Sequence, residues 1–157
     1  MRKAAFTTPK FRTAVHEAGH AVVAHCLDIK PEFIRLYPGD SKVKMSDRDY
    51  DFAKLEDIGA ALIAGDLSEL HHFGEVLSPS LNDQDDFYRL CLTEYQRRSA
   101  LWKAQDLVRQ NADHIWQLAS MLSHTDFMSG ERLAKALAGA GMVRALNIPQ
   151  LGTWKQY

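Results

Sequence analysis

Residues 8–27 read TPKFRTAVHEAGHAVVAHCL, and this stretch determines most of what the sequence predicts. Thr8 can cap a helix, and Pro9 suits the first helical position because a proline there loses no hydrogen bond. The run that follows is apolar nearly all round as far as Leu27, and the pattern stops before Pro31. We therefore expect a buried helix that begins at about Pro9 and ends at about Leu27.

The same helix carries the segment His16-Glu17-Ala18-Gly19-His20. Positions i and i+4 lie about 40° apart around a helix, so the imidazoles of His16 and His20 project from one face. Two neutral imidazoles placed in this way can bind one Zn²⁺ at about 2.0–2.1 Å each. Glu17 lies about 100° further round, where its carboxylate can take a proton from a water at the ion without ligating the ion. The pattern predicts a zinc hydrolase site in which Glu17 is the general base.

Two further residues of this helix, Gly19 and His25, bear on whether the segment binds a metal. Gly19 costs about 1 kcal/mol relative to alanine inside a helix. We expect it either to admit another backbone beside the metal face or to serve simply in helix packing. His25 lies about 900° of rotation beyond His16, on the opposite side, and is expected to be a surface or structural histidine. A buried helix whose two histidines bind nothing is disfavoured, because unpartnered imidazoles are costly in an apolar environment.

The composition is that of a soluble globular protein, and it predicts one domain over residues 1–157. Net charge is −1 and no basic run is present, which argues against nucleic acid or anionic membrane partners. Cys26 and Cys91 fall in apolar helical contexts and are expected to be reduced core thiols, which favours a cytoplasmic location. No stretch resembles a signal peptide or a membrane span, and no G-x-x-x-x-G-K-[ST] phosphate loop occurs.

The rest of the chain predicts a mainly α fold with a small β-hairpin beside the metal-motif helix. Strands are expected at Pro31–Tyr37 and Lys42–Met45, followed by a polar loop at 46–51. Further helices are expected over 52–71, from Ser80 or Asn82 through Glu94, over 100–123 and over 129–139. The tail, residues 141–157, is expected to pack on the surface or on a partner.

A catalytic zinc ion usually has three protein ligands and one open position, so a third ligand is needed. The candidates are the acids of Asn82-Asp83-Gln84-Asp85-Asp86, Glu69, and the pair His71 and His72. The acid cluster also suits a helix N-terminus, whose dipole favours negative charge. Adjacent histidines near a helix end more often face solvent. The chemistry of these residues alone leaves the choice open.

Over residues 10–140 the chain resembles the peptidase domain of the FtsH-type ATP-dependent zinc proteases. The resemblance is carried by His16 to His20, Gly65, Glu69, Phe73-Gly74, Asn82-Asp83, Ala104 to Leu122, Gly130-Glu131 and Leu133 to Leu137. It implies a helical FtsH-type peptidase domain. It also implies that His16, His20 and Asp83 bind Zn²⁺, with Glu17 as general base. Glu69 is implied to lie near the site, where we expect it to orient an imidazole N–H.

The resemblance further implies a polypeptide substrate bound to an extended strand. The residues that correspond to the family's substrate strand are Phe33, Ile34, Arg35, Leu36 and Tyr37. We expect a substrate to pair along an exposed edge of this strand. Two departures affect substrate choice. The family's paired-glycine segment with arginine reads Ala64-Gly65-Asp66 here, and residues 42–49 are charged where relatives are more apolar.

The function predicted from these residues is a zinc-dependent endopeptidase. The relatives' ATPase module and membrane anchor have no counterpart in this sequence. We therefore expect cleavage of flexible segments, or dependence on a separate ATPase or unfoldase. The relatives form rings, which makes a homo-oligomer a further expectation. One alternative is a non-catalytic binding or assembly module that retains a metal site, although such a site needs no Glu17. Another alternative, a metal-free helical scaffold, predicts no bound zinc.

Overall fold

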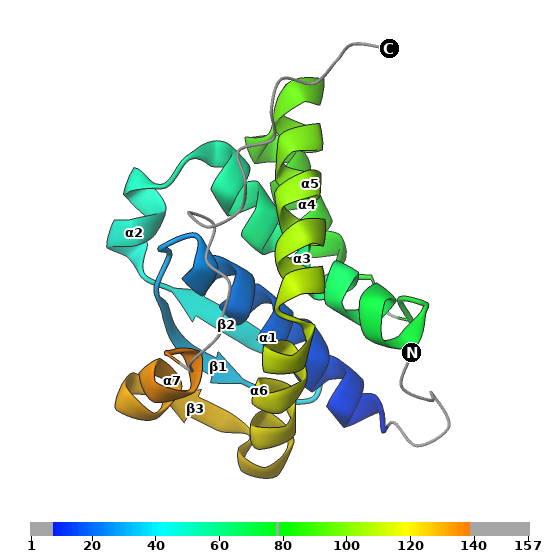
Figure 1. The fold of residues 1–157 in the computed structure, drawn as a ribbon, viewed down its shortest axis with the longest axis vertical. Helices are drawn as coiled ribbons and strands as arrows, with labels where there is room; N and C mark the ends of the chain where they lie inside the picture. The colour runs from blue at the N-terminus through cyan, green and yellow to red at the C-terminus, as the bar shows by residue number, and fades with distance from the viewer. Residues whose placement is uncertain (1–7, 78, 139–157) are drawn as a thin grey trace.

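The computed structural model describes residues 8–77 and 79–138, and within them the chain is mainly helical. Seven helices and three strands are present in this described part. Their order is α1 (Pro9–Cys26), β1 (Pro31–Arg35), β2 (Lys42–Met45), α2 (Asp47–Phe52), α3 (Leu55–Phe73), α4 (Leu81–Leu90), α5 (Glu94–Gln110), α6 (Ala112–Thr125), β3 (Phe127–Ser129) and α7 (Gly130–Leu137). Figure 1 shows α1 crossing the middle of the molecule. The expectation of a mainly α fold is confirmed.

Helix α1 is the centre of the hydrophobic core. Its predicted start is confirmed, since the Thr8 side chain accepts a hydrogen bond from the backbone N–H of Phe11 at 3.2 Å and Pro9 is the first helical residue. Residues 14–24 are all buried. The helix packs against α3 and α6, and it also contacts β1 and β2. Polar side chains on such a helix must find partners, because burying them unpaired is costly.

Gly19 allows α1 and α3 to approach closely. A Cβ added at Gly19 would lie 2.1 Å from Ser68 Oγ and 2.8 Å from the carbonyl oxygen of Ala64. The Ser68 hydroxyl donates to that same carbonyl at 2.7 Å, a hydrogen bond within α3. The expected approach of a second backbone beside the metal motif is therefore confirmed, and that backbone belongs to α3.

The small sheet has three antiparallel strands in the order β2-β1-β3, so β1 is central. Arg35 pairs with Lys42 on one side and with Phe127 on the other. The prediction that Phe33 to Tyr37 forms a strand with an exposed edge is therefore wrong, because β1 ends at Arg35 and both of its edges are occupied. Strand β3 spans only Phe127–Ser129, and three residues are too few to show a strand-like alternation in the sequence.

The segment predicted as a loop at 46–51 contains α2. The Ser46 hydroxyl caps this helix by accepting a hydrogen bond from the Asp49 backbone N–H at 3.4 Å. A serine followed by acidic residues Asp47 and Asp49 is a typical helix start, and the sequence carried this signal. The helix has only six residues and no fully buried side chain, so it shows no apolar periodicity.

One predicted helix ends earlier in the structure than expected, and another is divided. Helix α4 ends at Leu90, and a capping box starts α5: Thr93 Oγ1 accepts from the Gln96 N–H at 3.1 Å. The predicted helix over 100–123 breaks at Asn111, between α5 and α6. Apolar spacing continues across Asn111, which explains why periodicity alone joined α5 and α6.

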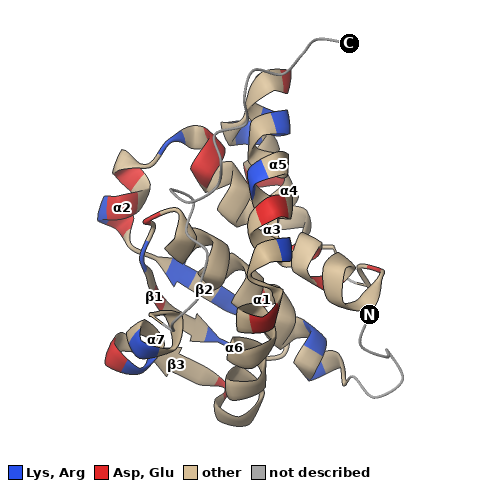
Figure 2. Ribbon diagram, in the orientation of Figure 1, with Lys and Arg blue, Asp and Glu red and all other residues tan. Residues whose placement is uncertain are grey.

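Cys26 and Cys91 are free and buried, as predicted. The predicted end of the last helix at Gly139 and the tail at 141–157 lie outside the described residues. Among the helices that the structure describes, none has the length and apolar character needed to cross a membrane. Figure 2 shows basic segments on β1 and β2 close to acidic segments on α2, with neither sign covering the face in view.

Candidate metal centre

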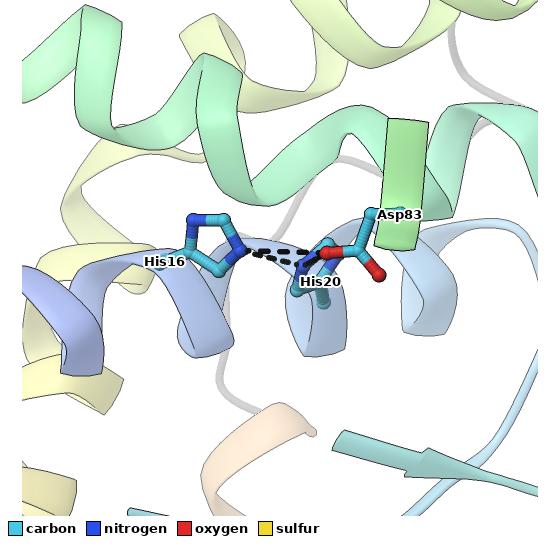
Figure 3. Close-up of side chains that lie close together, drawn as sticks. All are labelled: His16, His20 and Asp83. Carbon is cyan, nitrogen blue, oxygen red and sulfur yellow. Dashed lines mark hydrogen bonds and ion pairs between the residues drawn. The ribbon is translucent and has the colours of Figure 1, made fainter. Parts of the chain in front are cut away.

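Side chains from α1 and α4 converge on one point (Figure 3). The Nε2 atoms of His16 and His20 are 3.1 Å apart. Asp83 Oδ2 lies 3.2 Å from Nε2 of His20 and 3.6 Å from Nε2 of His16. Ligand atoms on a tetrahedral ion with bonds of about 2.0–2.1 Å are separated by roughly 3.3–3.4 Å. The three observed separations lie around that value, so this group could hold one metal ion.

Both imidazoles are oriented by hydrogen bonds to α3. His16 Nδ1 lies 2.9 Å from Glu69 Oε1, and His20 Nδ1 lies 2.7 Å from the carbonyl oxygen of Ala61. A carboxylate and a carbonyl can only accept, so each Nδ1 carries the hydrogen. When the imidazole is neutral, its Nε2 then has a lone pair directed at the common point. This is the arrangement by which outer residues fix the tautomer of metal-binding histidines.

Glu69 is itself held by Arg12, a residue that the sequence analysis did not single out. Arg12 Nη2 lies 3.5 Å from Glu69 Oε2 and donates to the backbone oxygen of Glu75 at 2.9 Å. Its guanidinium also lies 4.4 Å from the ring centroid of Phe73. Arg12 and Glu69 are both buried, and their pairing offsets the cost of burying each charge. The sequence indicates Arg12 only by its position, because it precedes His16 by one turn of the same helix and therefore lies on the same face.

Gly65 provides the space in which the imidazoles meet. A Cβ added at Gly65 would lie 2.5 Å from Nε2 of His16 and 2.5 Å from Nε2 of His20. Any larger residue would therefore displace the two candidate ligand atoms. Gly65 is expected from the sequence on the second helix and in the family pattern, but this role is not predicted. The sequence indicates this role only in that Gly65 lies inside a predicted helix. A glycine is disfavoured there unless a neighbouring group needs the space of a side chain.

The start of α4 brings Asp83 to this point. The Ser80 hydroxyl accepts a hydrogen bond from the Asp83 backbone N–H at 3.2 Å, which is the usual contact of a serine N-cap. Asp83 thus lies in the first turn of the helix, with its side chain 30% exposed. Asp85 and Asp86, the other acids of this cluster, are exposed and belong to neither candidate metal group within the described residues.

The remaining histidine candidates are not brought to the site. His71 is exposed, as expected for a residue near a helix end. His72 is buried and packs against Trp116 with ring centroids 5.3 Å apart, so the expectation that it faces solvent is wrong. His25 lines a separate hollow with Ile29 and Leu137.

Glu17 lies beside the candidate ligands and faces the same cavity. Glu17 is 6% exposed. Its pKa is influenced by charge interactions, without hydrogen bonds, from His16, His20, Asp83 and Glu69. Burial raises the pKa of Glu17 above its ordinary value, although the two imidazoles oppose the shift. A carboxylate with a raised pKa is a stronger proton acceptor, as a general base requires.

A cavity of about 730 Å³ opens at the three converging side chains. Its walls come from α1, α3, the start of α4, α2 and the whole of β2. None of the predicted substrate-strand residues, 33–37, lines it, whereas residues 39–45 do. Tyr50 of α2 also lines it, and burial raises the pKa of its phenol, so the hydroxyl remains a hydrogen-bond donor at neutral pH.

The metal-free site holds an extra proton. Burial alone would lower the pKa of His16, but its contacts with Asp83 and Glu69 raise it to about 10. Burial by itself would raise the pKa of Asp83, because it disfavours the charged carboxylate. Hydrogen bonds to His16 and His20 outweigh burial and hold this pKa well below its usual range. At neutral pH His16 is therefore an imidazolium that lies between two carboxylates. Its Nε2 must lose a proton before that atom can bind a metal.

Zinc binding to the metal-free protein is expected to release about one proton per ion at pH 7–8. The apparent affinity should rise about tenfold for each pH unit in this range, because His16 is protonated before binding and neutral after it. Calorimetric titrations with zinc in buffers of different ionisation enthalpy measure the number of protons. A binding enthalpy that does not depend on the buffer would contradict the assigned protonation.

No protein-family model and no curated protein sequence matches the chain. The resemblance to FtsH-type peptidases therefore rests on the residues quoted above, and it enters the function below as part of a proposal.

Proposed function

We propose that the protein is a zinc-dependent endopeptidase of the FtsH type, with His16, His20 and Asp83 as zinc ligands and Glu17 as general base. The main support is that three ligand atoms 3.1–3.6 Å apart face an open cavity, with a buried carboxylate from the same helical turn beside them. Structural zinc sites are closed by four protein ligands, whereas catalytic sites have three and an open position. The donor set and the cavity therefore favour catalysis over a structural role.

In the proposed hydrolysis, Glu17 transfers the proton, while Glu69 and Ala61 orient the two imidazoles. A bound Zn²⁺ supplies Lewis acidity, which polarises the scissile carbonyl and lowers the pKa of water. Glu17 takes the proton of the attacking water and then gives it to the leaving amine nitrogen. Its burial raises its pKa and so suits both transfers. Glu69 and the Ala61 carbonyl accept hydrogen bonds from the two Nδ1 atoms, which favours the orientation in which both Nε2 atoms face the site.

We assign the substrate-binding strand to β2, in place of the strand predicted from the sequence. Within the described residues β2 pairs with β1 alone, so its outer edge can accept another strand. Its residues, Lys42 to Met45, line the cavity that contains His16 and His20. An extended polypeptide added to this edge would run past the candidate metal centre, with backbone hydrogen bonds providing affinity.

The test is cleavage of a fluorogenic peptide library, together with the zinc content of the same protein. We expect about one zinc per chain and cleavage that a chelator abolishes. Asp83→Ala should reduce cleavage about 100-fold or more, because a ligand is lost. Asp85→Ala removes an exposed acid two residues away and should leave cleavage unchanged. A zinc-loaded protein that cleaves no library member would instead support a binding or assembly module, and absence of zinc would support a metal-free scaffold.

A further inference from the structure

The helix that delivers the third ligand is weakly held by apolar contacts. Among the side chains of α4 only that of Phe87 is buried. Leu81, the first residue of the helix, is 71% exposed. Phe87 lies one turn beyond Asp83 and packs near Gly59 and Ala100 of the neighbouring helices. Hydrophobic packing therefore fixes the middle of α4 more firmly than its first turn, where Asp83 lies.

Asp66 of α3 holds that first turn on both sides of Asp83. The backbone N–H of Ser80 donates to Asp66 Oδ1 at 3.4 Å. The side-chain amide of Gln84 donates to Asp66 Oδ2 at 3.0 Å. Ser80 precedes Asp83 and Gln84 follows it, so one carboxylate brackets the candidate ligand. Hydrogen bonds to a charged acceptor are stronger than neutral ones.

Asp66 also lies 3.6 Å from His16 Nδ1, which places His16, Asp66 and Glu69 in a second group that could hold a cation. The existing contacts favour another interpretation. His16 Nδ1 is 2.9 Å from Glu69, so its hydrogen is already donated there. One Asp66 oxygen accepts a hydrogen bond from Ser80, the N-cap of α4, and the other accepts one from Gln84 of α4. Asp66 therefore links α4 to the site instead of adding a second ion.

We propose that Asp66 is a positioning residue that holds Asp83 against the imidazoles of His16 and His20 and so completes the metal centre. The inference rests on the metal-binding part of the proposed function.

The test is a double-mutant cycle read out by zinc affinity, measured by competition with a chromophoric chelator. Asp66→Ala should weaken zinc binding about 10- to 100-fold in the otherwise unaltered protein. In an Asp83→Ala background the same change should alter affinity by less than about twofold, because the ligand that Asp66 positions is already gone. A residue that only stabilised the fold would weaken binding in both backgrounds.

Two variants on α4 serve as controls. Gln84→Ala removes one of the two hydrogen bonds without altering α3, and it should cause a smaller loss of zinc affinity that also disappears in the Asp83→Ala background. Asp85→Ala makes the same change in charge at an exposed position and should have no effect. Circular dichroism of the metal-free variants reports folding. If Asp66→Ala does not fold, the zinc affinity of Gln84→Ala, with and without Asp83→Ala, tests the same proposal.

The inference is overturned if Asp66→Ala leaves zinc affinity within about twofold of the original, or if it causes equal losses in both backgrounds. Equal losses would show that Asp66 acts through the stability of the fold or through His16, its other neighbour, and not through Asp83. The assay does not depend on peptide cleavage. A protein that shows the coupling and cleaves no peptide would refute the endopeptidase proposal and leave this inference standing.

Discussion

Glu17→Gln is expected to abolish peptide cleavage and to leave the metal centre loaded. Glutamine has nearly the same shape as glutamate but cannot accept the proton of the attacking water. General acid–base catalysis contributes about 10²–10⁴-fold, so a loss of that size is expected in kcat. The three candidate ligands are unchanged, so zinc content should remain at the original level. Steady-state kinetics on a fluorogenic peptide and elemental analysis of the same sample measure both quantities.

Two further substitutions sharpen this prediction. Glu17→Asp retains a carboxylate on a shorter side chain and should recover part of the activity, which the amide cannot do. Glu131→Gln alters a glutamate whose side chain is 83% exposed on α7, and it should change neither activity nor zinc content. Undiminished cleavage by fully zinc-loaded Glu17→Gln protein would remove Glu17 from the mechanism.

The parts of the site that follow from local geometry could be predicted from the sequence. His16 and His20 are one helical turn apart, so any helix over this segment places them together. The start of that helix is marked by Thr8 and Pro9, and the start of α4 by Ser80. These signals lie within a few residues of one another and depend little on the rest of the chain.

The parts that depend on contacts between distant segments could not be predicted from spacing. Arg12 and Glu69 are 57 residues apart, and nothing near either residue marks the other as its partner. The central position of β1 depends on β3, which lies almost a hundred residues further along the chain. Asp83 was selected through a resemblance, because the chemistry of the acid cluster alone did not distinguish it from its neighbours.

Gly65→Ala is expected to abolish zinc binding without unfolding the protein. The added Cβ would lie 2.5 Å from the Nε2 atoms of both His16 and His20. These atoms are at the ends of side chains, so the imidazoles can rotate away while the helices keep their places. Alanine also favours a helix over glycine by about 1 kcal/mol, which offsets the strain. Zinc affinity should therefore fall about 100-fold or more, with little change in the free energy of unfolding of the metal-free protein.

Gly19→Ala is the matched control, because Gly19 lies at the same interface between α1 and α3. Its added Cβ would meet the Ala64 carbonyl oxygen at 2.8 Å, and this backbone atom cannot swing aside as an imidazole can. The expected result is the reverse of that for Gly65: a loss of about 1–3 kcal/mol in the free energy of unfolding, with zinc still bound at one per chain. Chemical denaturation and chelator competition on both variants separate the two effects. If Gly65→Ala instead lowers stability and keeps its zinc affinity, Gly65 serves helix packing, and the imidazoles do not meet where the added Cβ would lie.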